Sequence, residues 1–216
     1  MFVATSVMAS GRGTAVYTVN TTADGDDGAC SKSNCTLREA ILLANAQPSG
    51  NAIIQFKVGT LNPVVIMPTS PLPAITNSVL LKTNLYNSID VVLDGSLAGL
   101  ADGLTLVADA ITVRDLTIQN FSGNGVLVTG SNSLIERNII SNNGGSGIQV
   151  SGGSGNTLNQ NAMFDNNSLG IDLDGDGQTN NDLGDSDSGA NGRQNFPTLI
   201  RAVPSELGLE IEGVFN

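Results

Sequence analysis

The residues best suited to chemistry form an acidic run near the end of the chain, Asp172-Leu-Asp-Gly-Asp-Gly-Gln-Thr-Asn-Asn-Asp182. The run fits the D-x-D-x-D-G pattern of calcium loops, in which a glycine permits the sharp turn that brings alternating carboxylates together. Oxygen ligands without histidine favour Ca²⁺ over transition metals. The expected metal ligands are Asp172, Asp174, Asp176, the carbonyl of Gln178, Asn180 and Asp182.

The match to a calcium loop is incomplete. Leu183 stands where the usual loop has a bidentate glutamate, and the sequence predicts no flanking helices, so an EF-hand is excluded. Asp182, Asp185 or Asp187 could supply the missing carboxylate. The alternative is a solvated acidic loop that binds no ion.

A second group of chemically capable residues is Asp115, Glu136 and Arg137, which a repeat described below places on adjacent turns of the chain. Together they could make a surface cluster of acid, base and cation. The simpler interpretation is an ion pair between Asp115 and Arg137, which is worth roughly 0–1 kcal/mol at a surface.

Composition excludes several other chemistries. The chain has no histidine, so Ser-His-Asp and Cys-His catalysis are ruled out and the commonest zinc ligand is missing. Twenty acidic residues against nine basic ones give a net charge of −11, which argues against a nucleic-acid partner. No apolar run is long enough to span a bilayer, so membrane insertion is not expected.

Cys30 and Cys35 are the only cysteines, and their spacing differs from the C-x-x-C redox motif. We expect them to form a short disulfide around residues 31–34. Such a bond implies an oxidising compartment, and hence a secreted or cell-surface protein. Residues 1–10 lack the basic start of a signal peptide, so residues 1–16 are expected to be disordered or the remnant of a leader.

Residues 17–50 are predicted to form an N-terminal cap. Residues 35–46 have the pattern of a short amphipathic helix, with Thr36 and Glu39 at capping-box spacing and Leu37, Ile41 and Leu42 as its buried stripe. A single helix ahead of a long β region is expected to cover the open end of a stack of strands.

Residues 51–195 are organised by a repeat. Residues 113–120 align with 135–142 and with 158–165, in steps of 22 and 23 residues, and Gly125, Gly147 and Gly170 begin a second strand at the same spacing. Each unit contains two or three short strands, which bury an inner face only by stacking about 4.8 Å from the next unit. The predicted fold class is all-β: a right-handed, single-stranded parallel β-helix resembling pectate lyases, with a short N-terminal capping α-helix.

Asn120, Asn142 and Asp165 fall at equivalent corners of the repeat, where asparagine and aspartate tolerate left-handed backbone angles and can bond the next turn. We therefore expect them to form a turn ladder. A leucine-rich repeat is the alternative solenoid, but its L-x-x-L-x-L pattern is missing. The nine-residue calcium repeat is also absent, because Thr157 stands where that motif has aspartate.

The stretch Cys35-Thr-Leu-Arg-Glu-Ala-Ile41, with residues 19–28 ahead of it, resembles the CSLREA-type N-terminal region, which precedes a right-handed β-helix in large bacterial surface and secreted proteins. Residues 170–177 and Gln194-Asn-Phe-Pro197 also resemble that group, so the likeness covers about residues 17–197. It implies the architecture and says little about activity. It also suggests that residues 196–216 are a C-terminal strand or the start of a truncated following domain, and that the chain is a fragment of a longer protein.

The function expected from these observations is a non-enzymatic rigid or adhesive β-helix module of an exported bacterial surface protein, with glycan, surface protein and Ca²⁺ as candidate partners. An open end of the helix would favour self-association. The alternative is a carbohydrate-active β-helix enzyme, namely a polysaccharide lyase, hydrolase or epimerase. A glycosidase needs two carboxylates about 5 to 9.5 Å apart in a cleft. Sugar sites usually add aromatic stacking surfaces, and the chain has no tryptophan.

Overall fold

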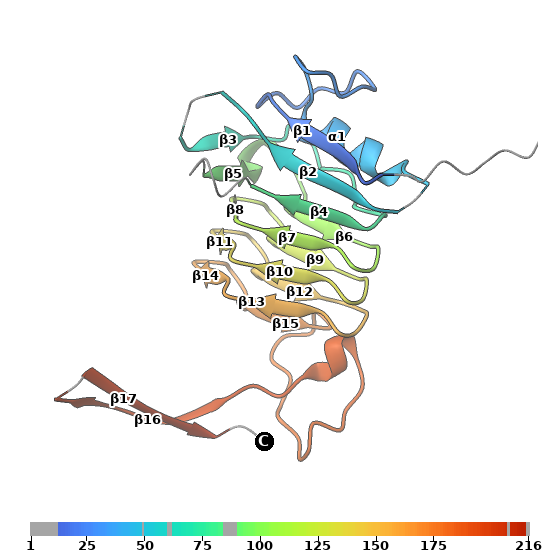
Figure 1. The fold of residues 1–216 in the computed structure, drawn as a ribbon. Helices are drawn as coiled ribbons and strands as arrows, with labels where there is room; N and C mark the ends of the chain where they lie inside the picture. Colours follow the sequence, from blue (N-terminus) through green and yellow to red (C-terminus); the bar gives the residue numbers. More distant parts are fainter. Residues whose placement is uncertain (1–12, 49, 60–61, 84–89, 207, 215–216) are drawn as a thin grey trace, which may run out of the picture.

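The computed structural model describes residues 13–48, 50–59, 62–83, 90–206 and 208–214. Three parallel sheets run side by side along a stack of coils (Figure 1). The first sheet has the order β1-β2-β4-β7-β10-β13, with β1 (Ala15–Val19), β2 (Ala52–Phe56), β4 (Val79–Lys82), β7 (Thr112–Arg114), β10 (Leu134–Glu136) and β13 (Thr157–Asn159).

The other two sheets complete each coil. The second has the order β3-β5-β8-β11-β14, with β3 (Val64–Ile66), β5 (Val91–Asp94), β8 (Leu116–Gln119), β11 (Ile139–Ser141) and β14 (Ala162–Phe164). The third has the order β6-β9-β12-β15, with β6 (Leu104–Leu106), β9 (Val126–Val128), β12 (Ile148–Val150) and β15 (Ile171–Leu173). The short 3-10 helix η2 (Gly95–Leu97) follows β5.

The register of the strands is the repeat seen in the sequence. Ile135 pairs with Val113 on one side and with Leu158 on the other, and Ile148 pairs in the same way with Val126 and Ile171. Side chains at inner positions of the central coils are fully buried and stack into one continuous core. The predicted parallel β-helix is therefore confirmed, with three strands in each complete coil.

At the corners between strands the backbone has the predicted left-handed conformation, but the residues that bond from coil to coil are mainly not the predicted ones. Asn120, Asn142 and Asp165 have φ values of 60°, 57° and 54°, as expected for left-handed corner residues. The side chains that bond from coil to coil, however, belong mainly to the residues that follow a corner. Among them are Asn138 and Asn143, which are 1% and 2% exposed.

Asn143 shows what these buried asparagines do. Its Oδ1 accepts the backbone N–H of Phe121 at 3.0 Å, and its Nδ2 donates to the carbonyl of Ile118 and to Asn166 Oδ1. Asn138 repeats the arrangement at the preceding corner, with the backbone of Leu116 and Val113. Each ladder asparagine thus bonds backbone groups of the preceding coil on both sides of a corner, in or directly after the strands that meet there.

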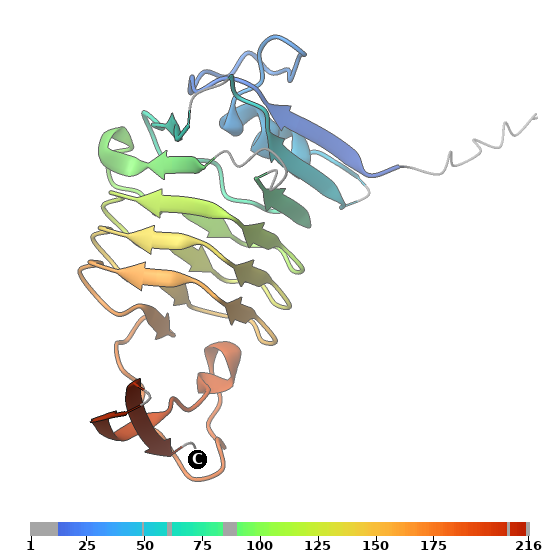
Figure 2. The same cartoon turned by 60° about the vertical axis from the view of Figure 1, so that its left-hand side comes forward.

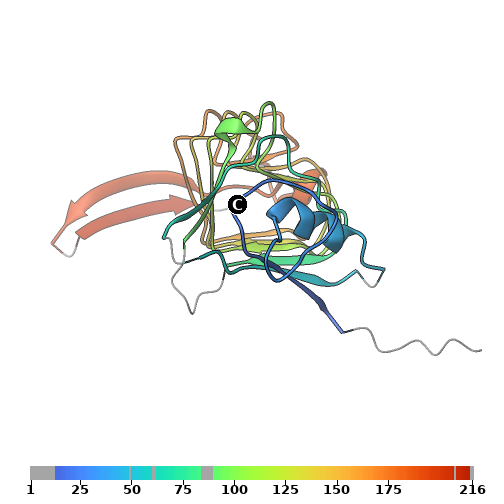
Figure 3. The same ribbon diagram turned by 90° about the horizontal axis from the view of Figure 1, so that it is seen from above.

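The N-terminal end of the stack is closed by α1 (Leu37–Asn45), which lies across the outline of the coils (Figure 3). The capping box is present: Thr36 Oγ1 accepts the Glu39 N–H and Glu39 Oε2 accepts the Thr36 N–H. The buried apolar residues of the helix are Leu37, Ala40, Ile41 and Ala44. The assignment of Leu42 to the buried stripe is wrong. Its side chain is 38% exposed, because the narrow helix stripe faces the coil through the other four residues.

Arg38 ties the cap to the coils. Its guanidinium bonds both carboxylate oxygens of Asp24, whose side chain is 5% exposed, and donates to the carbonyls of Ser70 and Pro71. Asp24 also accepts the backbone N–H of Thr69. The predicted disulfide between Cys30 and Cys35 is present beside this junction. None of the described helices has the length and hydropathy of a membrane span.

Beyond β15 the chain crosses the other end of the stack. Residues 174–197 form loops and the short 3-10 helix η3 (Ala190–Arg193), followed by the antiparallel hairpin of β16 (Thr198–Ser205) and β17 (Gly208–Val214). The hairpin projects away from the coils (Figures 1 and 2). At the N-terminus, residues 1–12 of the predicted leader lie outside the described residues, and β1 begins at Ala15.

The ladder predicts the cost of removing one asparagine. Asn143→Ala removes the acceptor of the Phe121 N–H and a donor to the Ile118 carbonyl and to Asn166 Oδ1, and each buried group left without a partner costs about 1–3 kcal/mol. We expect the free energy of unfolding, measured in urea, to fall by about 3 kcal/mol. Asn142→Gly is the matched control at the exposed neighbouring residue, with an expected change below about 1 kcal/mol. Equal losses in the two variants would contradict the ladder.

The Arg38 junction makes a separate prediction. Arg38→Met leaves the carboxylate of Asp24 without its cation, and breaking a buried pair in this way costs about 3 kcal/mol. The loss should be visible as a lower urea midpoint. Lys32→Met removes the same charge from an exposed side chain and should leave the midpoint almost unchanged. An unchanged midpoint in Arg38→Met would show that the junction does not hold the cap.

Candidate functional site

The acidic run crosses the C-terminal end of the stack directly after β15. Asp172 lies on β15 itself and is 6% exposed. Its Oδ1 accepts the backbone N–H of Gly177 at 3.3 Å, and its Oδ2 accepts the Ser146 hydroxyl at 3.4 Å. Asp172 therefore closes the turn at Gly177 and attaches it to the preceding coil.

Asp174 and Asp176 both form ion pairs with the guanidinium of Arg193. Arg193 Nε lies 2.5 Å from Asp174 Oδ2, and Arg193 Nη2 lies 3.4 Å from Asp176 Oδ2. The backbone N–H of Ala190 and the Arg193 guanidinium lower the pKa of Asp174, and the hydrogen bond to Asp174 raises the pKa of Arg193. In this arrangement the guanidinium occupies the space beside the two carboxylates that a metal ion would need.

Three other carboxylates converge later in the run. Oxygens of Asp182, Asp185 and Asp187 lie within 4.8 Å of one another. The Ser186 hydroxyl donates to Asp182 at 2.6 Å and lowers the pKa of Asp182. Oδ1 of Asp187 is buried and has no hydrogen-bond partner among the described residues. These are hard oxygen ligands of the kind that Ca²⁺ prefers.

Asn195 fixes this group to the end of the chain crossing. It is 4% exposed, and its N–H donates to Asp185 Oδ1 at 2.8 Å. Its side chain accepts the Asp182 N–H and donates to the Asp182 carbonyl. Of the other predicted ligands, Gln178 lines a neighbouring cavity and Asn180 is exposed. The predicted calcium set remains a prediction. The carboxylates that converge are Asp182, Asp185 and Asp187, the three residues named as possible substitutes for the missing glutamate.

The second predicted group is a surface ion-pair network between β7 and β10. Arg137 Nε lies 2.8 Å from Asp115 Oδ1, which confirms the predicted ion pair, and Arg137 Nη1 lies 3.0 Å from Glu136. Sequence reasoning missed Arg114, which lies 3.4 Å from Glu136 and 3.8 Å from Asp115. The repeat pairs Arg114 with Glu136 one coil later, and this pairing could have identified Arg114 as a member of the network.

The electrostatics of this network are unfavourable for elimination chemistry. The base of a lyase must be unprotonated near neutral pH, so that it can take a proton from the substrate. The hydrogen bond with Asp115, followed by the charges of Asp115 and Glu136, instead raises the pKa of Arg137. Two acids and two guanidinium groups also leave the network neutral, with each acid engaged by both arginines.

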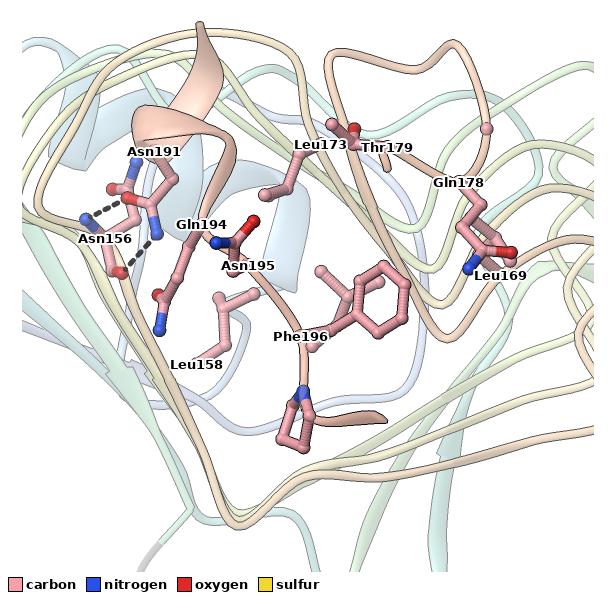
Figure 4. A pocket seen from close by; sticks show the side chains of 13 residues that line it. Asn156, Leu158, Leu169, Leu173, Gln178, Thr179, Asn191, Gln194, Asn195 and Phe196 are labelled. Atoms are coloured by element: carbon pink, nitrogen blue, oxygen red, sulfur yellow. Dashed lines mark hydrogen bonds between the residues drawn. The ribbon is translucent and has the colours of Figure 1, made fainter. Parts of the chain in front are cut away.

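A cavity of about 580 Å³ lies under the chain crossing. Its apolar wall is formed by inner side chains of the last coil, including Leu158, Ile171 and Leu173, and Phe196 faces the same space (Figure 4). Asn156 and Asn191 bond each other at its edge. The sequence could have indicated this cavity, since the clear repeat ends near residue 173 and, among the described residues, no later coil covers those inner positions.

Comparison with known proteins supports the fold. Residues 97–192 match a family model described as a right-handed β-helix region, which extends from η2 to η3. No curated protein sequence matches the chain. The matched residues do not include the CSLREA-type motif at residues 19–41, which remains a prediction. The fold of the chain is the right-handed parallel β-helix.

Proposed function

We propose that the chain is a rigid, non-enzymatic module of an exported bacterial surface protein, with a CSLREA-type N-terminal region. Its lateral faces would contact polysaccharide or another surface protein. The observation that carries the proposal is the neutral network of Arg114, Asp115, Glu136 and Arg137. The most promising acid–base group of the sequence is already used to connect two coils.

Rigidity is supported by the way successive coils are connected. Strands pair from coil to coil in all three sheets, and ladder asparagines bond the corners between those strands. α1 closes one end over a buried core. Such a stack suits a spacer that holds a binding surface away from a cell, since each coil contacts its neighbours only. The disulfide at the cap supports export, because disulfides persist in oxidising compartments.

Turnover separates this proposal from a carbohydrate-active enzyme. The purified chain is incubated with a panel of polysaccharides and followed by reducing-end release and by absorbance of unsaturated products near about 235 nm. We expect no turnover, and expect binding on a glycan array or to a surface protein. The double variant Asp115→Asn, Glu136→Gln should give the same result as the wild type. Product formation that this variant abolishes would replace the proposal with a lyase or hydrolase.

We further propose that the acidic loop binds Ca²⁺ through Asp182, Asp185 and Asp187. Three features support it: the closeness of their oxygens, the lowered pKa of Asp182, and the buried unpaired oxygen of Asp187. A bound cation would offset the repulsion among the three negative charges. It would also stabilise the chain crossing that Asn195 fixes.

Calcium titration tests this part of the proposal. Isothermal titration should detect heat, and the melting temperature should rise by about 5 °C at about 100 times the dissociation constant relative to EDTA. Asp187→Asn should lose both effects. Asp165→Asn removes an equal charge at an exposed corner and should keep them. A wild-type protein with neither heat nor shift would end the calcium proposal.

A further inference from the structure

The C-terminal end of the β-helix leaves its core partly bare. Ile171 occupies the inner position that Ile148 holds one coil earlier, yet Ile171 is 41% exposed whereas Ile148 is fully buried. Leu158 and Leu173 likewise continue rows of buried residues and are only partly covered. These side chains form the wall of the end cavity. The apolar surface follows directly from the end of the stack, because inner side chains are buried only by the next coil.

The same end also presents unpaired strand edges. β13, β14 and β15 are the last strands of their sheets, and no described strand pairs with their outer edges. One corner is closed: Asn191 donates to the Asn156 carbonyl and accepts the Asn156 N–H, which continues an asparagine ladder by one step. Open edges beside apolar surface favour association with another β element.

The hairpin of β16 and β17 is such an element, and its two faces differ. The register pairs Arg201 with Glu212 and Val203 with Glu210, and Arg201 bonds both glutamates. The alternating pairs, Ala202 with Ile211 and Pro204 with Leu209, lie on the opposite face. Leu209 and Ile211 are 62% and 59% exposed. A two-stranded hairpin with an uncovered apolar face is marginally stable in water, so this face is suited to burial.

The hairpin does not cover the end of its own β-helix. Asn181 bonds both the N–H and the carbonyl of Phe196, which fixes the direction in which the chain leaves the crossing. The strands then extend beyond the outline of the coils (Figure 3). Within one chain, therefore, the apolar face of the hairpin does not lie against the uncovered end of the coils.

We propose that the two surfaces meet in a symmetric dimer, in which the hairpin of each copy covers the last coil of the other. Their sizes match: seven residues of β17 span about 24 Å at 3.4 Å per residue, and one side of a three-sided coil of 22 residues is of about the same length. The apolar face of the hairpin then covers the end cavity. The pair of Arg201 with Glu210 and Glu212 stays in water.

The oligomeric state of the full chain tests the dimer, measured by sedimentation velocity over a range of concentrations. Ile211→Lys puts a charge on the apolar face of the hairpin, outside the β-helix core. It should raise the dimer dissociation constant about a hundredfold or more, as expected when a charge replaces a buried apolar anchor. Val203→Lys makes the same substitution on the charged face, opposite Glu210, and should leave the dimer intact.

A variant at the other surface decides how the copies meet. Ile171→Lys should also give monomers, and mixing it with Ile211→Lys should restore a weaker dimer, because one hairpin and one coil end remain intact. Dimers of Ile171→Lys would indicate hairpin-to-hairpin contact, and dimers of Ile211→Lys would indicate end-to-end stacking. Either result overturns the proposal, as does a monomeric wild type. Circular dichroism and melting temperature verify that each variant is folded.

Discussion

The whole structure depends on satisfying backbone groups at the corners of the coils. Strand pairing satisfies the N–H and carbonyl groups within each sheet, but the chain must turn three times per coil without leaving the core. Buried asparagines solve this problem, because an amide side chain can accept from one backbone group and donate to another. Asn143 and Asn138 make the same three hydrogen bonds: each accepts one backbone N–H, donates to one backbone carbonyl and donates to the asparagine of the next coil. Successive coils are therefore held in the same geometry.

This constraint also shapes the surface. When strands stack in register, outward side chains form rows, and unlike charges in neighbouring rows meet as Arg137 and Asp115 do. Such pairs satisfy one another and reduce the chemical reactivity of the face. A catalytic site on this scaffold would need carboxylates that remain free of such pairing. Among the described residues, the closest group of this kind is at Asp182, Asp185 and Asp187, outside the regular coils.

Periodicity made most of the fold predictable from sequence. The steps of 22 and 23 residues gave the register of β10 with β7 and β13, and the left-handed corners at Asn120 and Asn142 followed from residue type. Asn143 was missed because the preceding Asn142 has the same chemistry, so only burial distinguishes the two residues. Arg193 could not be placed beside Asp174, because a loop without a repeat carries no register.

The two ends of a solenoid pose the same physical problem, and this chain solves it differently at each. At the N-terminal end, α1 buries its apolar stripe over the core and Arg38 fixes the cap to the coils. At the C-terminal end, the crossing leaves Ile171 exposed. Each copy still presents two different surfaces there, the last coil and the apolar face of the hairpin, and contacts between unlike surfaces extend head to tail unless both form between the same two copies. In the proposed dimer each hairpin covers the other copy's coil, so both surfaces of both copies are used and no further copy can be added.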